Sequence, residues 1–248
     1  MVRSCPACGE ADFEATARFD RVPVQVNRLA RTREEALASP CGPIDLVRCR
    51  HCGTSWNHRF DPALVHYDAG YDNPLDVSPV FRDWQTGAAR DLVARHQLHG
   101  ATVLEVGCGR AGFLRAVLAA GAGRGLAYEP AWDPAWPVPP GCEIRSSAFQ
   151  SVGADDRRAD LVILRHVLEH LEEPLALLQL LRQLGCPILV EVPDGATLME
   201  PGGCWDLIYE HVSYFEASGM SRLLERAGFA VDRIGREFGD QFLVVDAR

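Results

Sequence analysis

Short apolar runs alternate with amphipathic stretches through the chain from residue 81 onwards. The apolar runs predict buried strands, and apolar residues at helical spacing predict helices that pack on them. Because strands alternate with helices, the pattern predicts a doubly wound parallel sheet, whose ligands lie at the carboxyl ends of the strands. The predicted strands are 101–106, 125–128, 143–147, 160–164 and 187–192, and the predicted helices are 81–98, 113–120 and 175–184.

The C-terminal part departs from this alternation. A helix predicted at 218–227 is followed by strands at 231–234 and 241–245, with the turn Phe238-Gly239-Asp240 between them. Strands this close in sequence pair as an antiparallel hairpin. The predicted sheet therefore ends in an antiparallel hairpin, which an ordinary dinucleotide-binding fold does not contain.

The N-terminal part has only short predicted strands, at 19–26 and 44–48, between two C-x-x-C-G turns. In each turn two thiolates converge on one ion, and the glycine relieves the tight backbone behind them. Four thiolates form a closed tetrahedral shell, which is typical of a structural zinc and leaves no position for substrate. The predicted zinc ligands are Cys5, Cys8, Cys49 and Cys52.

Composition and charge narrow the class of partner. The chain has 248 residues and a net charge of -9, and residues 61–248 hold 16 Arg against 27 acidic residues. So acidic a region is a poor partner for nucleic acid or for an anionic membrane. The sequence has no signal-peptide pattern and no apolar run long enough to span a bilayer, so we expect a soluble, cytoplasmic protein. Its nine scattered cysteines fit metal ligation and free thiols better than a disulfide framework.

A glycine loop lies between the strand 101–106 and the helix that follows it. Gly107, Gly109 and Gly112 satisfy G-x-G-x-x-G, so an NAD-type oxidoreductase is one interpretation. However, Glu105 lies in the strand end and the loop has no lysine for a phosphate. S-adenosylmethionine has no phosphate and carries a sulfonium and an ammonium group, so a carboxylate suits it better. Glu129, 22 residues after Gly107, follows the next strand and is expected to bind ribose hydroxyls in either case.

The stretch from Glu105 to Gly112 resembles the E-x-G-x-G-x-G motif of the class I methyltransferase family, although Ala111 stands at the third glycine of that motif. The resemblance implies S-adenosylmethionine as the cofactor. It also implies an adenine site beside Ala148 and Phe149, where Ala148 replaces the acid of many family members. The cofactor-binding residues that we expect in this part are Glu105, Gly107, Cys108, Gly109, Glu129, Ala148 and Phe149.

The segment Arg165-His166-Val167-Leu168-Glu169-His170 is similar to the H-V-L-E-H segment after the fourth strand of many small-molecule methyltransferases. Arg165 and His166 are therefore expected to line the cofactor pocket, and His170 to be an ordinary helix residue. Tyr67 and Tyr71 lie in the linker before the cofactor domain. We include Tyr71 among the cofactor contacts, as part of a flap over the ligand, although the linker tyrosines would equally serve as surface anchors.

Tyr209, Glu210 and His211 place proton-handling side chains after the fifth predicted strand, where such a sheet delivers its active site. With four N-terminal cysteines, the chain resembles the zinc-containing deoxysugar C-methyltransferases, which have a Y-x-E-H segment there. The resemblance implies that His211 removes a proton, beside Glu210, whereas Tyr209 is one residue out of register. We expect this chain to lack the second Rossmann-like domain that completes the substrate site in that family, which argues against a nucleotide sugar as the acceptor. The expected acceptor is a small molecule, such as a sugar or a natural-product intermediate.

The predicted fold is an α/β Rossmann-like class I methyltransferase sheet with a small N-terminal zinc module. We expect a zinc module at 1–55, a linker and a helix that covers the cofactor site at 56–99, and the S-adenosylmethionine domain at 100–248. Two other functions stay open: an RNA methyltransferase that grips RNA with the zinc module, and a non-catalytic binding module. The sequence leaves the oligomeric state open.

Overall fold

The computed structural model describes residues 4–26, 28–65, 77–200 and 203–248. Its strands are β1 (Phe13–Pro23), β2 (Cys41–Cys49), β3 (Ser55–Asn57), β4 (Thr102–Val106), β5 (Arg124–Tyr128), β6 (Cys142–Arg145), β7 (Leu161–Arg165), β8 (Ile188–Pro193), β9 (Ser213–Tyr214), β10 (Val231–Glu237) and β11 (Phe242–Ala247). Its α-helices are α1 (Arg33–Ala38), α2 (Pro79–Arg95), α3 (Gly112–Ala119), α4 (Pro174–Arg182) and α5 (Ala217–Arg226). Short 3-10 turns are η1 (Pro62–Leu64), η3 (Asp156–Arg158), η4 (Leu168–His170) and η5 (Gly195–Met199).

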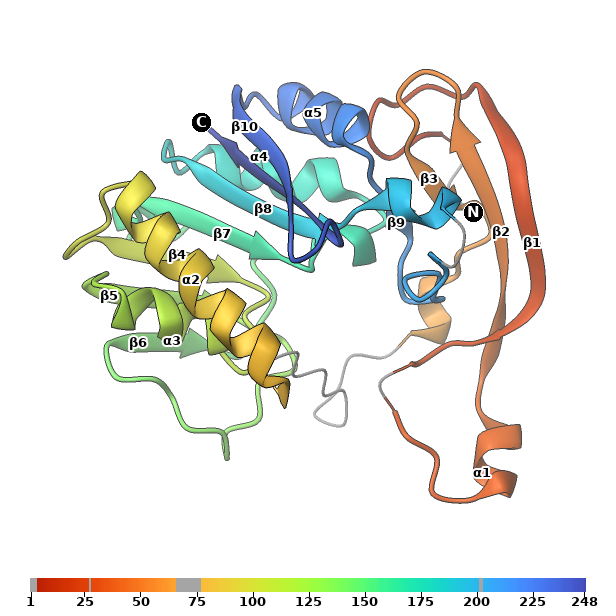
Figure 1. The fold of residues 1–248 in the computed structure, drawn as a ribbon, viewed down its shortest axis with the longest axis horizontal. Coiled ribbons are helices and arrows are strands. Elements are labelled where there is room, and N and C mark those ends of the chain that lie inside the picture. Colours follow the sequence, from red (N-terminus) through yellow and green to blue (C-terminus); the bar gives the residue numbers. More distant parts are fainter. Residues whose placement is uncertain (1–3, 27, 66–76, 201–202) are drawn as a thin grey trace. The chain divides into compact units, whose positions relative to one another are not determined.

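The strands form two sheets (Figure 1). A seven-stranded sheet has the order β10-β11-β8-β7-β4-β5-β6, and its pairs β4–β5, β4–β7 and β5–β6 are parallel. The four-residue connection between β10 and β11 makes them a terminal antiparallel hairpin. The predicted mixed, doubly wound sheet is therefore confirmed, and every strand and helix predicted after residue 80 is present within a few residues of its expected position.

Described residues fall into two compact units. The first unit lies within 1–66, 166–179 and 191–245, and the second lies within 67–165, 180–190 and 246–248. The second unit thus contains the glycine loop with β4 to β7, and the first contains the cysteine turns with the segment around His211.

The first unit is built on an antiparallel sheet of order β1-β2-β3-β9. Strands β1 and β2 form a long hairpin, and β3 pairs with β9 through Ser55 opposite Tyr214 and Trp56 opposite Ser213. A backbone hydrogen bond from Asn57 to the Val212 carbonyl extends this pairing (2.9 Å). Residues next to the cysteine turns therefore share one sheet with the segment that follows His211.

The second unit has β4 at its centre, between β5 and β7. Fully buried apolar residues of β4 and β7 form its core, as expected for a parallel sheet covered on both faces. Helix α2 begins where Ser78 accepts a hydrogen bond from the Phe81 amide and Pro79 occupies the first turn. This helix was predicted from its apolar residues at helical spacing, and the cap explains why it begins two residues before the predicted start at Phe81.

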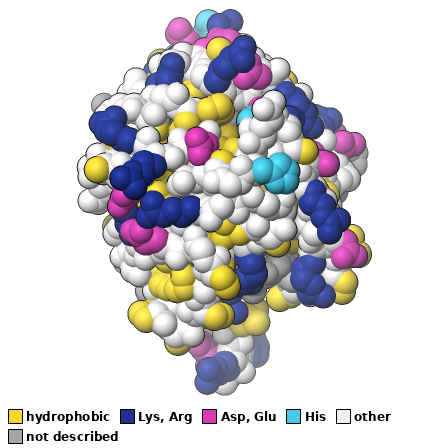
Figure 2. Space-filling model, turned by 90° about the vertical axis from the view of Figure 1, so that its left-hand side faces the viewer, with side chains coloured by type: hydrophobic (Ala, Val, Ile, Leu, Met, Phe, Trp, Pro, Cys, Tyr) yellow, Lys and Arg dark blue, Asp and Glu magenta, His cyan; other side chains and the backbone are white. Residues whose placement is uncertain are grey.

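Arg and acidic side chains are interspersed with hydrophobic ones on the face shown in Figure 2. Ion pairs of Arg124 and Arg145 with Glu143 follow the same mixed pattern on β5 and β6 (3.0 and 2.9 Å). Across the ranges that the structure describes, no helix is both long enough and apolar enough to cross a lipid bilayer.

Candidate functional site

The glycine loop lies at the carboxyl end of β4, where the chain passes into α3. Gly107 and Gly109 have φ values of +75° and +52°, which glycine adopts readily. A Cβ built at Gly109 would have no heavy atom within 4 Å, so the backbone here is open to a ligand. Ala111 is the N-cap of α3 and has φ +56°. This is the left-handed conformation that the third glycine of the motif would adopt more readily.

Glu129 is tied directly to this loop. Its Oε2 accepts a hydrogen bond from the Gly109 amide (2.8 Å), and its Oε1 accepts one from the Ala131 amide (3.0 Å). A carboxylate oxygen has a second lone pair, so both oxygens can still accept ribose hydroxyls. Glu105 is buried in β4, with Ala127 of β5 and Ile163 of β7 as its pairing partners.

Cys108 and the residues expected at the adenine surround the same loop in the second unit. Burial, together with the charges of Glu105 and Glu129, raises the pKa of the Cys108 thiol, so this cysteine is not a nucleophile. Phe149 is buried and packs edge-on against Tyr128, with ring centroids 4.9 Å apart, whereas the neighbouring Ala148 is exposed.

Arg165 ends β7 between two aromatic rings. Its guanidinium carbon lies 4.0 Å from the ring centroid of Phe113, in the first turn of α3, and 5.6 Å from that of Trp84 in α2. Cation–π contacts of this kind hold an arginine side chain in place. The predicted cofactor residues of the second unit therefore lie on the loop and strand ends that such a fold uses for ligands.

His166 opens the histidine cluster of the first unit. It has φ +54°, a left-handed conformation that is uncommon for residues other than glycine. Its Nε2 lies 3.1 Å from Glu191 Oε1, and its Nδ1 lies 3.4 Å from Glu169 Oε1. Burial alone would lower the pKa of His166, but these two carboxylates outweigh burial and raise that pKa to about 9.

His170 and His211 face one another edge to face, with ring centroids 4.8 Å apart. His170 Nδ1 lies 3.1 Å from the Glu210 carbonyl oxygen, and His211 Nδ1 lies 2.9 Å from the Asp206 carbonyl oxygen. Burial lowers the pKa of His170. Burial together with the charge of His170 lowers the pKa of His211 to about 3, so the His211 ring is neutral at physiological pH.

Glu210 and Tyr209 are directed away from His211. The buried Glu210 carboxylate accepts a hydrogen bond from the Val26 amide (3.4 Å), and burial raises its pKa. The Tyr209 hydroxyl accepts a hydrogen bond from the Asp61 amide (3.0 Å), and its ring stacks on Phe60 in the core of the first unit. Within the described structure, no hydrogen bond joins the side chains of Glu210 and His211.

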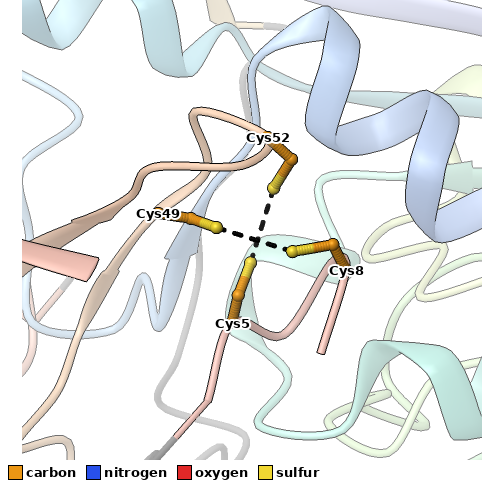
Figure 3. Close-up of side chains that lie close together, drawn as sticks. All are labelled: Cys5, Cys8, Cys49 and Cys52. Carbon is orange, nitrogen blue, oxygen red and sulfur yellow. Dashed lines mark hydrogen bonds between the residues drawn. The ribbon is translucent and has the colours of Figure 1, made fainter. Parts of the chain in front are cut away.

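The four predicted zinc ligands come together in the first unit (Figure 3). Their Sγ atoms lie within 4.8 Å of one another, with Cys5–Cys52 and Cys8–Cys49 separations of 3.5 Å. Sulfur is the donor that structural zinc sites prefer, and four sulfurs complete a tetrahedral shell. The donor set therefore fits a structural zinc, and these cysteines form no disulfide.

Comparison with known proteins identifies the fold. A family model described as a methyltransferase domain matches residues 81–234, which is more than half of the chain. The chain belongs to this family. The prediction of a methyltransferase is thereby confirmed. No curated protein sequence matches the chain.

Solved structures similar to the methyltransferase domain have a similar fold. Mitomycin 7-O-methyltransferase MmcR is 21% identical with a TM-score of 0.52, and the match covers 68% of this chain and 54% of that one. An S-adenosylmethionine-dependent methyltransferase from Aquifex aeolicus is 20% identical with a TM-score of 0.53, and the match covers 76% of this chain and 98% of that one. The 1,6-didemethyltoxoflavin-N1-methyltransferase of Burkholderia thailandensis, solved with S-adenosylhomocysteine, is 18% identical with a TM-score of 0.52. The match covers 68% of this chain and 80% of that one. At these identities the likeness establishes the Rossmann-like methyltransferase fold, as predicted.

Several residues differ from the sequence-based expectation or fall outside it. Tyr67 and Tyr71 lie outside the described residues. The expectation of an ordinary helix residue at His170 is wrong, because His170 ends a 3-10 turn against His211. Glu169 and Glu191 were not predicted. An acid inside the apolar strand β8 is the signal that could have identified Glu191, as it did Glu105 in β4.

Proposed function

We propose that this chain is an S-adenosylmethionine-dependent methyltransferase for a small-molecule acceptor and that His211 removes the acceptor proton. The match of residues 81–234 to the methyltransferase family model is the observation that carries the cofactor assignment, and the hydrogen bond from the Gly109 amide holds Glu129, the proposed ribose acceptor, beside the open loop. The Burkholderia relative of the same fold was solved with S-adenosylhomocysteine, which supports this choice over NAD.

Each predicted cofactor residue has a task in this proposal. The backbone at Gly107, Cys108 and Gly109 approaches the cofactor closely, and Glu129 binds its ribose. Further contacts are proposed for Tyr71 in the linker, Glu105 in β4, Ala148 and Phe149 after β6, Arg165 at the end of β7, and His166 directly after that strand. The bound cofactor supplies an electrophilic methyl group, so the protein has to align the acceptor and move its proton.

His211 is suited to accept that proton. A carbonyl oxygen only accepts hydrogen bonds, so the contact with Asp206 places the ring hydrogen on Nδ1 and leaves the Nε2 lone pair as the base. The low pKa of His211 keeps this lone pair unprotonated before reaction. It also makes the ring a weak base, because burial and the charge of His170 outweigh the negative charge of Glu169, which raises the pKa of His211.

The cysteine cluster belongs to the proposal as a structural zinc site in a module at residues 1–55. The linker at 56–99 would then bring a helix to the cofactor domain at 100–248. The resemblance to deoxysugar C-methyltransferases supports a sugar or natural-product intermediate as the acceptor. Tyr209 and Glu210 would shape the site without touching the proton, since their polar atoms are directed at the backbone of Asp61 and Val26.

Calorimetry tests the cofactor assignment. The protein should bind S-adenosylhomocysteine, and Glu129→Ala should weaken that binding by about 10- to 100-fold because a charged hydrogen-bond acceptor is lost. Glu172→Ala, which changes an exposed acid in the first unit, is the matched control and should leave the affinity unchanged. Tight NAD binding without any response to S-adenosylhomocysteine would reverse the assignment.

Turnover tests the base. An acceptor is first found by transfer of a radiolabelled methyl group from S-adenosylmethionine to small molecules that contain keto or hydroxyl groups. With that acceptor, His211→Ala should lower turnover by about 10² to 10⁴ while S-adenosylhomocysteine affinity stays unchanged. His99→Ala removes an exposed histidine of the second unit and should be neutral. Near-normal turnover of His211→Ala would mean that the base lies elsewhere.

A further inference from the structure

Glu169, His170 and His211 form a second cluster of metal-binding side chains, within the first unit. One ligand atom from each residue lies within 4.8 Å of the other two. Glu169 and His170 come from the turn η4, and His211 comes from the segment before β9. Glu169 is 2% exposed and His211 is 7% exposed, so the cluster is largely removed from solvent.

The hydrogen bonds of the two histidines fix the same tautomer on each ring. Nδ1 of His170 and Nδ1 of His211 each face a backbone carbonyl oxygen, at 3.1 and 2.9 Å. A carbonyl oxygen cannot donate, so each Nδ1 is the N–H, and the lone pair of the neutral ring lies on Nε2. Histidines that ligate metals usually donate their other ring N–H in this way, because it fixes the ring orientation.

Glu169 adds a buried carboxylate whose charged neighbour among the described residues is His166. In the part of the chain that the structure describes, neither of its oxygens accepts a hydrogen bond, and Oε1 faces His166 Nδ1 at 3.4 Å. A buried carboxylate without donors is costly, since burial removes its water. Together with two imidazole lone pairs it makes a compact group of three acceptors to which a cation can bind.

We propose that Glu169, His170 and His211 bind a divalent transition-metal ion, Zn²⁺ or an ion with similar ligand preferences, at a site separate from the four cysteines. Two imidazoles and one carboxylate are a ligand set of open zinc sites, in which water or substrate takes the fourth position. Donor atoms around one zinc lie about 3.4 Å apart, so each side chain has to move by about an ångström or less to close the site.

An ion at this site would change what His211 can do. One lone pair cannot bind both an ion and a proton, so the Nε2 atom that serves as the base in the metal-free protein is blocked when the ion is present. The site is therefore expected to inhibit methyl transfer reversibly. The metal assignment itself rests on the cluster geometry and does not depend on the proposed reaction.

Zinc content measured by elemental analysis after dialysis against Zn²⁺ tests the assignment. The wild type and the control His99→Gln should each retain one zinc more per chain than His170→Gln and His211→Gln. The result is a difference in zinc per chain between proteins that share the cysteine site, so zinc bound by the cysteines does not affect it. In Co²⁺ titrations, the equivalent that these two variants lose should lack the thiolate-to-cobalt absorption that cysteine ligation produces.

Folding of the variants is checked by thermal unfolding and by S-adenosylhomocysteine affinity, and Glu169→Gln provides a third variant with nearly the same side-chain volume. Loss of a residue that only hydrogen-bonds to a metal ligand weakens metal binding by about 10- to 100-fold. Loss of a direct ligand in these variants should weaken Zn²⁺ binding by more than that. Equal zinc content in the wild type and in all three folded variants would overturn the proposal. If His211→Ala did not affect turnover, the assignment of His211 as the base would be wrong, but the proposal of a metal site would still stand.

Discussion

Asp246 shows how one buried carboxylate contributes pH-dependent stability. It is 3% exposed, lies 2.9 Å from His96 Nε2 and forms an ion pair with Arg95 Nε at 3.0 Å. Burial alone would raise the pKa of Asp246, but the hydrogen bond from His96 and the charge of Arg95 lower it below its ordinary value. The folded pKa therefore lies below the unfolded one, so this group stabilises the fold at neutral pH and loses that effect as the pH falls through the folded pKa.

Asp246→Asn should accordingly lower the free energy of unfolding by about 2 kcal/mol at pH 7, because it removes charge-assisted hydrogen bonds. The difference from the wild type should shrink as the pH falls below about 4, where the unfolded carboxyl group takes up its proton. Urea unfolding at pH 7 and at a pH below about 4 measures this difference in the free energy of unfolding. Asp91→Asn, at an exposed position of α2, is the control and should change stability by less than about 0.5 kcal/mol. A difference that is the same at both pH values would contradict the explanation.

Single residues were predictable where a residue type has one common use. Cysteine pairs, loop glycines and an acid after a strand indicate ligands by themselves, and the structure brings the four cysteines together and joins Glu129 to the Gly109 amide. Side-chain direction was not predictable, because neighbours in sequence share no direction in an irregular segment. Glu210 adjoins His211, yet its carboxylate contacts Val26, and the carboxylate that faces the His211 ring comes from Glu169.

Helix α5 is the element that holds the cysteine turns. Its Ser218 hydroxyl donates to the Cys52 carbonyl oxygen (2.7 Å), and Arg226 donates to the Ala7 carbonyl oxygen. Gly219 lies at the contact itself, where a Cβ would collide with the Thr54 hydroxyl. The helix can approach the turn this closely only because position 219 has no side chain.

Gly219→Ala should therefore destabilise the protein by about 1 to 3 kcal/mol through overpacking. Gly87→Ala is the matched control, since Gly87 lies inside α2 and a methyl group at this position would have no heavy atom within 4 Å. Alanine favours a helix over glycine, so this control should stabilise the protein by about 0.8 to 1 kcal/mol. Both effects are measured by urea unfolding, and a neutral or stabilising Gly219→Ala would show that α5 does not pack tightly on Thr54.

Long elements were predictable because their periodicity repeats, and short ones were not. Strands β3 and β9 have three and two residues, too few for alternation to appear, and their pairing joins distant parts of the chain. The six-residue helix α1 did have a signal, since Thr32 accepts a hydrogen bond from the Glu35 amide in a T-x-x-E capping pattern. No residue of α1 is buried, so the helix has no apolar face whose spacing would have supported that signal.

At the scale of the whole molecule, the first unit joins the cysteine turns to the segment of His211 through shared strands. Its sheet runs from β1 and β2, which ends at Cys49, through β3 to β9, which begins two residues after His211. The sequence predicted the cysteine turns and the segment of His211 as two separate sites. It could not predict that they share a sheet, because pairing between residues 55–57 and 213–214 leaves no local pattern. A change at the cysteine site is therefore expected to reach the segment of His211 through the shared strands.

Cys49→Ser should test this coupling. Loss of one thiolate opens the closed zinc shell, and the strands that the metal stabilises lose order with it. Hydrogen exchange should then rise at residues 55–57 and 212–214 together, and turnover should fall. S-adenosylhomocysteine affinity should stay within about twofold, because all proposed cofactor contacts except His166 belong to the second unit. Cys186→Ser, a change outside both metal-binding clusters, is the matched control and should leave exchange and turnover unchanged. Faster exchange at 55–57 with an unchanged 212–214 segment and normal turnover would show that the shared sheet does not couple the two regions.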